Sequence, residues 1–374
     1  MFIWVVISLH FYLVTVLAGS YNFVFIQQTF WYFFECIFGS ILLYKYLENR
    51  YDYKRVMYLL LTVFVIQSVF VILTFVSDSL RDAINSALVI NDDRDLSTYR
   101  MKGLTNSGGA GLSYIQTIGV LFGCVLWVQE TKRANRFYLA IAMGVILTSQ
   151  MFIARTGLIF TSLLIFMAYT QQAINKGSIF ILLKQLGWVV GLGLFFFQVL
   201  VMIIPEGRLA SFQERVVGRS FEFIESYERT GEFRTTSTDV LKKMYILPDD
   251  DIELLFGIGE WDAAPGTRGY FQRRVPSDVG YVRAIYAVGL IMSIIFYSIY
   301  FNYIKVLLKS EYARQFLFLF LTLSIIFILG ETKEPFLVRA TGVIKALFLF
   351  HFSFIWGLSK TKIIAERGNL NHVE

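Results

Sequence analysis

The sequence predicts an all-α polytopic membrane protein, and two observations carry this prediction. Hydrophobic residues make up 56% of the 374 residues, whereas charged residues make up only 17%. The apolar residues also gather in ten runs, most of them close to or above the roughly 18 residues that a helix needs to cross a bilayer. We expect about ten transmembrane helices, at residues 1–18, 23–45, 55–77, 110–128, 136–154, 157–173, 179–204, 279–304, 315–330 and 340–358.

The placement of lysine and arginine predicts how the helices are oriented in the membrane. Under the ten-helix count, the basic clusters of the short loops all fall on one side, which the positive-inside rule assigns to the cytoplasm. Both termini are then cytoplasmic, and the long polar segments 78–109 and 205–278 face outward together. The chain divides into transmembrane helices 1–7 with their outward loop (1–204), a large outward loop (205–278), transmembrane helices 8–10 (279–358) and a cytoplasmic tail (359–374).

The outward loop 205–278 is too long to be a simple connection, because loops of this length are usually functional or disordered. Apolar residues at helical spacing predict a helix within Arg208–Arg229. Thr236 and Asp239 resemble a capping box, which predicts a short helix at Val240–Leu247. An apolar stretch with two glycines, 254–259, is typical of a packed turn. The loop is therefore expected to be a small, partly helical platform on the membrane surface.

Several charged residues lie where charge is costly, at the outward membrane interface. Arg155 is at the tip of a tight hairpin, Arg283 is about one helical turn inside the eighth predicted span, and Arg339 opens the tenth. The remaining candidates are in outward loops: Arg100, Arg234, Glu331 and Lys333. Guanidinium groups suit phosphate oxygens, so these residues indicate an anionic headgroup, such as the phosphate or diphosphate of a lipid. The alternative is that they extend to the interface and pair with ordinary phospholipids or nearby acids.

Other patterns point to no cofactor and no metal. The sequence has no Cys/His metal spacing, phosphate-binding loop, dinucleotide fingerprint or nucleophile elbow. We expect the lone His10 to be a hydrogen-bonded packing residue, and Asp249-Asp250-Asp251 to form a solvated turn in preference to a cation site. Trp261 in the outward loop could stack on a sugar ring.

Six short motifs, taken in order, carry a family resemblance. They are the segments Arg100–Ser113, Arg155-Thr156-Gly157, Gly257-Ile258-Gly259, Ser277-Asp278-Val279-Gly280-Tyr281, Ala287-Val288-Gly289-Leu290-Ile291 and Glu331-Thr332-Lys333-Glu334-Pro335-Phe336. Their order, together with many spans and a large outward loop before the last helices, resembles the bacterial O-antigen and capsule repeat-unit polymerases of the Wzy type. The resemblance covers most of the chain, although each motif is short and degenerate.

This resemblance implies a metal-independent C-type glycosyltransferase, acting at the periplasmic face of the bacterial inner membrane. Such an enzyme moves a growing glycan from undecaprenyl diphosphate onto a new lipid-linked repeat unit. Arg155, Arg100 and Arg283 would bind the diphosphate and stabilise it as the leaving group. Asp278 or Glu331 would be the general base, although Asp278 could equally cap a helix. The expected partners are lipid-linked glycan donor and acceptor, membrane lipids and a chain-length regulator, with no nucleic acid.

Two other functions remain open from the sequence. An O-antigen ligase would use the same donor but transfer the glycan to lipid A-core. A flippase for lipid-linked oligosaccharides would need polar residues across the full membrane depth, whereas the charged residues here gather near one face.

Overall fold

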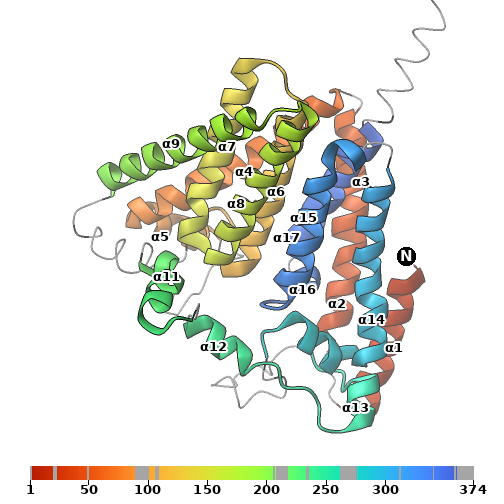
Figure 1. The fold of residues 1–374 in the computed structure, drawn as a ribbon. Helices are drawn as coiled ribbons and strands as arrows, with labels where there is room; N and C mark the ends of the chain where they lie inside the picture. The colour runs from red at the N-terminus through yellow and green to blue at the C-terminus, as the bar shows by residue number, and fades with distance from the viewer. Residues whose placement is uncertain are drawn as a thin grey trace, which may run out of the picture. The chain divides into compact units, whose positions relative to one another are not determined.

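The computed structural model describes residues 2–19, 23–48, 50–88, 101–105, 109–204, 207, 218–232, 236–261, 275, 277–310, 313–339, 341–357 and 359. The described residues are largely helical, and none of them lies in a strand (Figure 1). This confirms the all-α fold class. The two compact units interleave along the chain: unit 1 is Met1–Phe38, Glu222–Lys309 and Leu323–Ile344, and unit 2 is the remainder.

Unit 2 contains a bundle of long helices. Its elements are α3 (Gly39–Glu48), α4 (Tyr53–Val76), α5 (Asp78–Ala87), α6 (Gly109–Gln129), α7 (Arg133–Ile153), α8 (Arg155–Asn175) and α9 (Ile179–Ile203). Helix α6 packs against α4, α7 and α8 and is buried along almost its whole length. A Cβ atom on Gly119 would meet the ring of Phe64 at 2.4 Å, so small residues let these helices approach closely. The first part of α15 (Ala313–Glu331), most of α17 (Thr341–His351) and the π-helical η5 (Phe352–Trp356) complete the unit.

Unit 1 combines helices from the beginning, middle and end of the chain. It holds α1 (Phe2–Leu17), α2 (Val24–Trp31), the π-helical η1 (Tyr32–Phe38) and most of α11 (Arg219–Thr230). It also holds α12 (Thr236–Lys242), α13 (Asp251–Phe256), α14 (Gly280–Lys309), the end of α15 and α16 (Phe336–Arg339). Helix α14 packs against both α1 and α13.

The protein is a membrane protein by the length and composition of its helices. Six described helices, α4, α6, α7, α8, α14 and α15, are long and apolar enough to cross a bilayer, and shorter apolar helices lie at Ile3–Leu17 and Gly342–Trp356. Each of the ten predicted runs contains a helix among its described residues. The count of ten membrane crossings, their orientation and the periplasmic placement of the loop stay predictions.

The structure corrects one expectation for the long loop and describes only part of another. The predicted helix at 240–247 was placed too late, because α12 runs from Thr236 to Lys242. Met244 is buried with Val279, Val282 and Tyr286, so tertiary packing ends the helix before Pro248 does. The helix predicted within 208–229 is present from Arg219 onward as α11, and residues 208–217 lie outside the described part of the chain.

Candidate functional site

The site in unit 1 is organised by a sharp bend in α14 at Gly289. This glycine has φ 75° and ψ 170°, a conformation essentially restricted to glycine. The rings of Tyr281 and Tyr297 lie 4.9 Å apart, although a straight helix would separate these residues by about 24 Å. Residues 280–288 therefore form a short segment that folds back beside the long segment 290–309. The span predicted at residues 279–304 is thus helical and apolar, but a bend that the sequence analysis did not predict interrupts it at Gly289.

The end of α13 fits into this bend. A Cβ atom on Gly257 would lie 2.6 Å from the backbone nitrogen of Gly289, so these two glycines bring the end of α13 and the bend of α14 into backbone contact. The N–H of Ile258 donates to the carbonyl of Tyr286 at 2.8 Å. The Nε2 atom of His10 on α1 lies 3.0 Å from the carbonyl oxygens of both Phe256 and Val288. His10 is thus the hydrogen-bonded packing residue that the sequence predicted.

The residues that follow this contact are also packed inside unit 1. Gly259, with φ +67°, approaches the backbone of Thr15 so closely that a Cβ atom would lie 2.5 Å from its Cα. Trp261 is fully buried, which overturns the expectation that it stacks on a sugar. Asp250 accepts hydrogen bonds from the N–H groups of Ile252 and Glu253 and is the N-cap of α13.

Arg283 is a buried cation in the short segment of α14. Only 2% of its surface is exposed, and its Nε donates to the carbonyl of Ser277 at 2.7 Å. Its Nη2 lies 2.9 Å from Oδ1 of Asp278, whose side chain is 34% exposed. Arg283 therefore fixes the turn that leads into α14. Arg283 lies in the first turn of α14, on the segment before Gly289.

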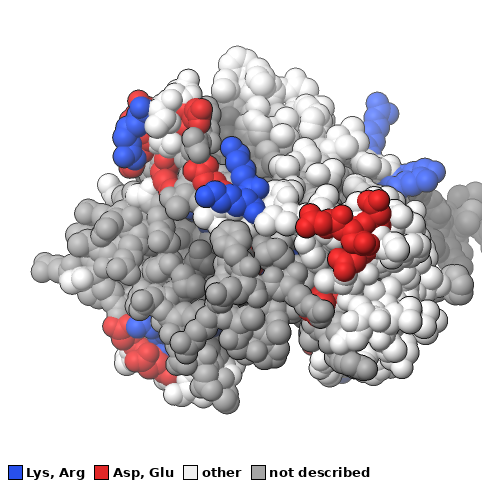
Figure 2. Space-filling view, turned by 90° about the horizontal axis from the view of Figure 1, so that it is seen from below, with Lys and Arg blue, Asp and Glu red and all other residues white. Residues whose placement is uncertain are grey.

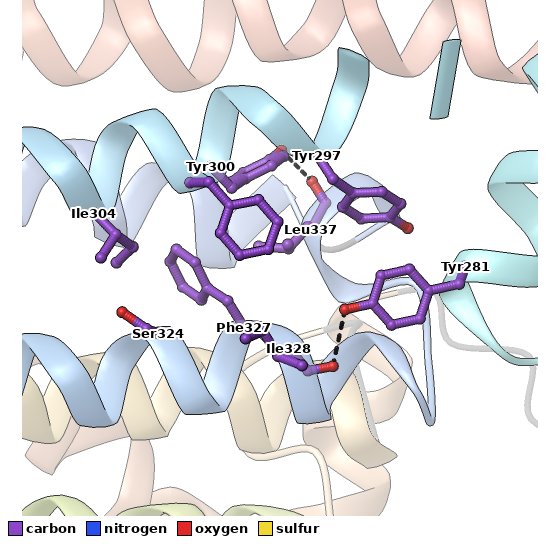
Figure 3. Close-up of a pocket in the computed structure, with 9 residues that line it drawn as sticks. Tyr281, Tyr297, Tyr300, Ile304, Ser324, Phe327, Ile328 and Leu337 are labelled. Carbon is purple, nitrogen blue, oxygen red and sulfur yellow. Dashed lines mark hydrogen bonds between the residues drawn. The ribbon is translucent and has the colours of Figure 1, made fainter. Parts of the chain in front are cut away.

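Glu331, the last residue of α15, is fully buried beside this segment. One of its oxygens accepts from the N–H of Leu337 at 2.6 Å, and the other accepts from the hydroxyl of Tyr297 at 2.8 Å. A Cβ atom on Gly280 would lie 1.9 Å from the second oxygen, so any side chain there would displace the carboxylate. The hydroxyl of Tyr300 donates to the carbonyl of Leu337 at 2.6 Å (Figure 3). Glu331 thus joins α14, α15 and the loop that follows α15.

The eight predicted site residues do not all fall in one described place. Unit 1 holds Asp278, Arg283, Glu331 and Lys333, whereas Arg155 begins α8 in unit 2. Arg100 and Arg234 lie outside the described residues, and the side chain of Arg339 does too. In Figure 2, the described charged side chains form small groups among described uncharged residues.

Sequence analysis missed the tyrosines and glycines that shape this site. Tyr297 and Tyr300 are three residues apart on α14, so they share a helix face, but their apolar surroundings gave no reason to single them out. Gly280 and Gly289 were named only as members of motifs, with no structural role assigned to them. A glycine inside a helical pattern indicates a bend or a close approach, and that signal could have found Gly289.

Comparison with known proteins yields no relative. No protein-family model matches the sequence, and neither a curated protein nor a solved structure shows significant similarity to it.

Proposed function

We propose that this protein polymerises undecaprenyl diphosphate-linked oligosaccharide repeat units into O-antigen or capsule polysaccharide at the periplasmic face of the inner membrane. The observation that carries this proposal is the convergence of four resembling motifs in unit 1. Gly257 contacts Gly289, 32 positions later, and Gly280 contacts Glu331, 51 positions later. Motifs that specify a common site are expected to meet in this way, whereas unrelated short matches are not.

The two carboxylates of the site suit different roles. Asp278 is one-third exposed, so the hydroxyl of an acceptor sugar can reach it, whereas Glu331 is fully enclosed. Asp278 is therefore the better general base. It would take the acceptor's hydroxyl proton as the new glycosidic bond forms at the anomeric carbon of the donor. Glu331 holds Gly280 and Leu337 in place and acts as a positioning residue.

The donor's bond to its lipid carrier breaks in the same step, and undecaprenyl diphosphate leaves with the bonding electrons. Cations that stabilise the developing charge on this leaving group would lower the barrier. Arg283 is already bonded to Asp278 and Ser277, so its role is to hold the base. Arg155, Arg100, Arg234, Lys333 and Arg339 are the proposed diphosphate ligands.

The buried polar side chains of unit 2 do not support a flippase. One group, near the start of α8, joins Thr117, Gln150 and Thr161 through hydrogen bonds of 3.1–3.2 Å. A second group, Gln172 and Gln185, lies about 16 Å further along α8. The buried side chains between them on α8 are mainly apolar: Leu164, Ile165, Ala168 and Tyr169. On α8, a mainly apolar stretch therefore separates the two groups of hydrogen-bonded polar side chains.

The proposal is tested by the glycan ladder of a polysaccharide-producing strain that lacks this chain. The intact protein should restore long polymer, whereas Asp278→Asn and Arg155→Ala should restore none while accumulating to normal levels. Asp82→Asn and Arg229→Ala are matched controls, because the side chains of Asp82 and Arg229 are 74% and 75% exposed and neither residue is a proposed site residue. Single repeats still attached to lipid A-core in the deletion strain support a polymerase. Loss of all attached repeats would indicate a ligase and refute the proposal.

A further inference from the structure

Basic residues from three segments of unit 2 lie at the ends of its long helices. Arg136 is in the first turn of α7, Lys176 directly follows α8, and Arg314 is the second residue of α15. Each of these helices is long and apolar enough to cross a bilayer. Figure 1 shows the start of α7 and the end of α8 at the same end of unit 2. The three cations are thus placed where these helices would leave the hydrocarbon, at the level of the lipid headgroups.

Hydrogen bonds join the end of α8 to the start of α15. The Nε2 atom of Gln171 donates to the carbonyl of Arg314, and the Nδ2 atom of Asn175 donates to the carbonyl of Gln315, each at 3.4 Å. Asn175 immediately precedes Lys176 in the sequence. These bonds therefore hold Lys176 and Arg314 in neighbouring positions, although they are 138 residues apart in the chain.

Arg136 lies close to Lys176 as well. Desolvation and, after it, the positive charge of the Arg136 guanidinium lower the pKa of the Lys176 ammonium. The Nε atom of Arg136 donates to the carbonyl of Glu130 at 2.8 Å, which is a neutral acceptor. The carboxylate of Glu130 accepts instead from the side chains of Tyr58 and Asn135.

No acid among the described residues neutralises this cluster. None of the ion pairs found in the described part of the chain includes Arg136, Lys176 or Arg314. Like charges that are held together in this way repel one another, and an anion between them would remove the repulsion.

Large apolar side chains are exposed beside the cations. Phe137 and Ile174 are each 55% exposed, and Ile179 and Phe180, at the start of α9, are 62% and 78% exposed. Cationic groups next to such a surface suit a molecule that has both an anionic headgroup and acyl chains. A soluble anion would use the cations and leave the apolar side chains uncovered.

We propose that Arg136, Lys176 and Arg314 bind the phosphate of an anionic phospholipid, whose acyl chains lie against the exposed apolar residues of α7, α8 and α9. The bound lipid then links the ends of α7, α8 and α15. This inference is independent of the proposed polymerase activity, because none of these three residues belongs to the candidate site.

Native mass spectrometry of the protein in detergent micelles measures the binding of added lipids. The intact protein should bind phosphatidylglycerol at least about tenfold more tightly than phosphatidylcholine. The double variant Lys176→Gln/Arg314→Gln should bind phosphatidylglycerol about 25-fold more weakly, because each Lys or Arg near an anionic lipid contributes a factor of about five. Its affinity for phosphatidylcholine should not change. The matched control Lys242→Gln/Lys243→Gln removes the same charge from exposed positions in unit 1 and should bind both lipids as the intact protein does.

Three results would overturn the inference. The first is equal affinity of the intact protein for the two lipids, a comparison that needs no variant. The second is unchanged binding of phosphatidylglycerol by Lys176→Gln/Arg314→Gln, or an equal loss in Lys176→Arg/Arg314→Lys, which keeps both charges. The third is displacement of phosphatidylglycerol by an equal concentration of glycerol phosphate, because the site would then bind a soluble anion. None of these measurements involves glycan transfer, so any of these results leaves the polymerase proposal standing.

Discussion

Replacing Gly289 with alanine tests the bend that organises unit 1. The backbone conformation at this position is nearly exclusive to glycine, and forcing another residue into it costs about 1–3 kcal/mol. The new Cβ atom would also lie 2.2 Å from the carbonyl oxygen of Leu255 and must move by about 1.2 Å to reach the 3.4 Å of an ordinary contact. No side-chain rotation can relieve this clash, because the three nearest atoms all belong to the backbone of Leu255 and Phe256.

A shift of that size breaks the hydrogen bonds that hold the end of α13. The N–H of Ile258 loses the carbonyl of Tyr286, and His10 loses one or both of its carbonyl partners. Each lost bond costs about 0.5–1.5 kcal/mol. With mid-range values, about 2 kcal/mol for the backbone and about 1 kcal/mol for each of two or three bonds, we expect Gly289→Ala to destabilise this part of the protein by about 4–5 kcal/mol.

Hydrogen exchange of the purified protein in nanodiscs is the direct assay. The amide of Ile258 should exchange about a hundredfold faster or more in Gly289→Ala, because each 1.4 kcal/mol is a factor of ten. The control is Gly193→Ala on α9, where a Cβ atom meets nothing within 4 Å. That change should be neutral or slightly stabilising, because alanine favours a helix by about 1 kcal/mol over glycine. Unchanged protection of Ile258 in Gly289→Ala would refute the described contact between α13 and α14.

Three further predictions follow from contacts and charges. Asp278→Ala leaves the guanidinium of Arg283 buried without that partner, so it should lower the stability to thermal unfolding by about 1–3 kcal/mol more than Arg283→Met does. The double variant should recover part of the stability that Asp278→Ala loses. Strictly additive effects of the two substitutions would contradict the pairing. Gly280→Ala displaces the carboxyl of Glu331 and should abolish polymer at normal protein levels; a normal glycan ladder would contradict the positioning role. Burial raises the pKa of Glu130 between α6 and α7, but hydrogen bonds from neighbouring donors outweigh it and lower the pKa to about 2. Because this pKa lies below that of Glu130 in the unfolded chain, the stabilisation by the carboxylate is present above about pH 4.5 and is lost as the pH falls toward 2. The difference in melting temperature between wild type and Glu130→Gln should therefore shrink over that range. A difference that stays constant would contradict this prediction.

The helices were predictable because apolar runs long enough to cross a bilayer dominate the sequence. The bend was not predicted, because Gly289 lies inside an uninterrupted apolar run, Ala287-Val288-Gly289-Leu290-Ile291, and the glycine itself is its only local signal. Its conformation depends on the backbone of Gly257, a residue more than 30 positions away. Long-range packing of this kind leaves no periodic signal.

The candidate site was predictable in its residue types and less so in their arrangement. Arg283 and Glu331 stood out because charge is costly near a membrane, and both proved to be buried. The sequence could not show that Arg283 is bonded to Asp278, or that Glu331 is enclosed while Asp278 is partly exposed. The enclosure of Glu331 involves Tyr297 and Gly280, which carry no charge to draw attention.

The central claim is tested most directly by the purified protein in nanodiscs with undecaprenyl diphosphate-linked repeat units, in a buffer with a chelator and no nucleotide. The account predicts a ladder of longer lipid-linked glycans from the intact protein, and none from Asp278→Asn. Unchanged single repeats with the intact protein, or a full ladder from Asp278→Asn, would contradict it.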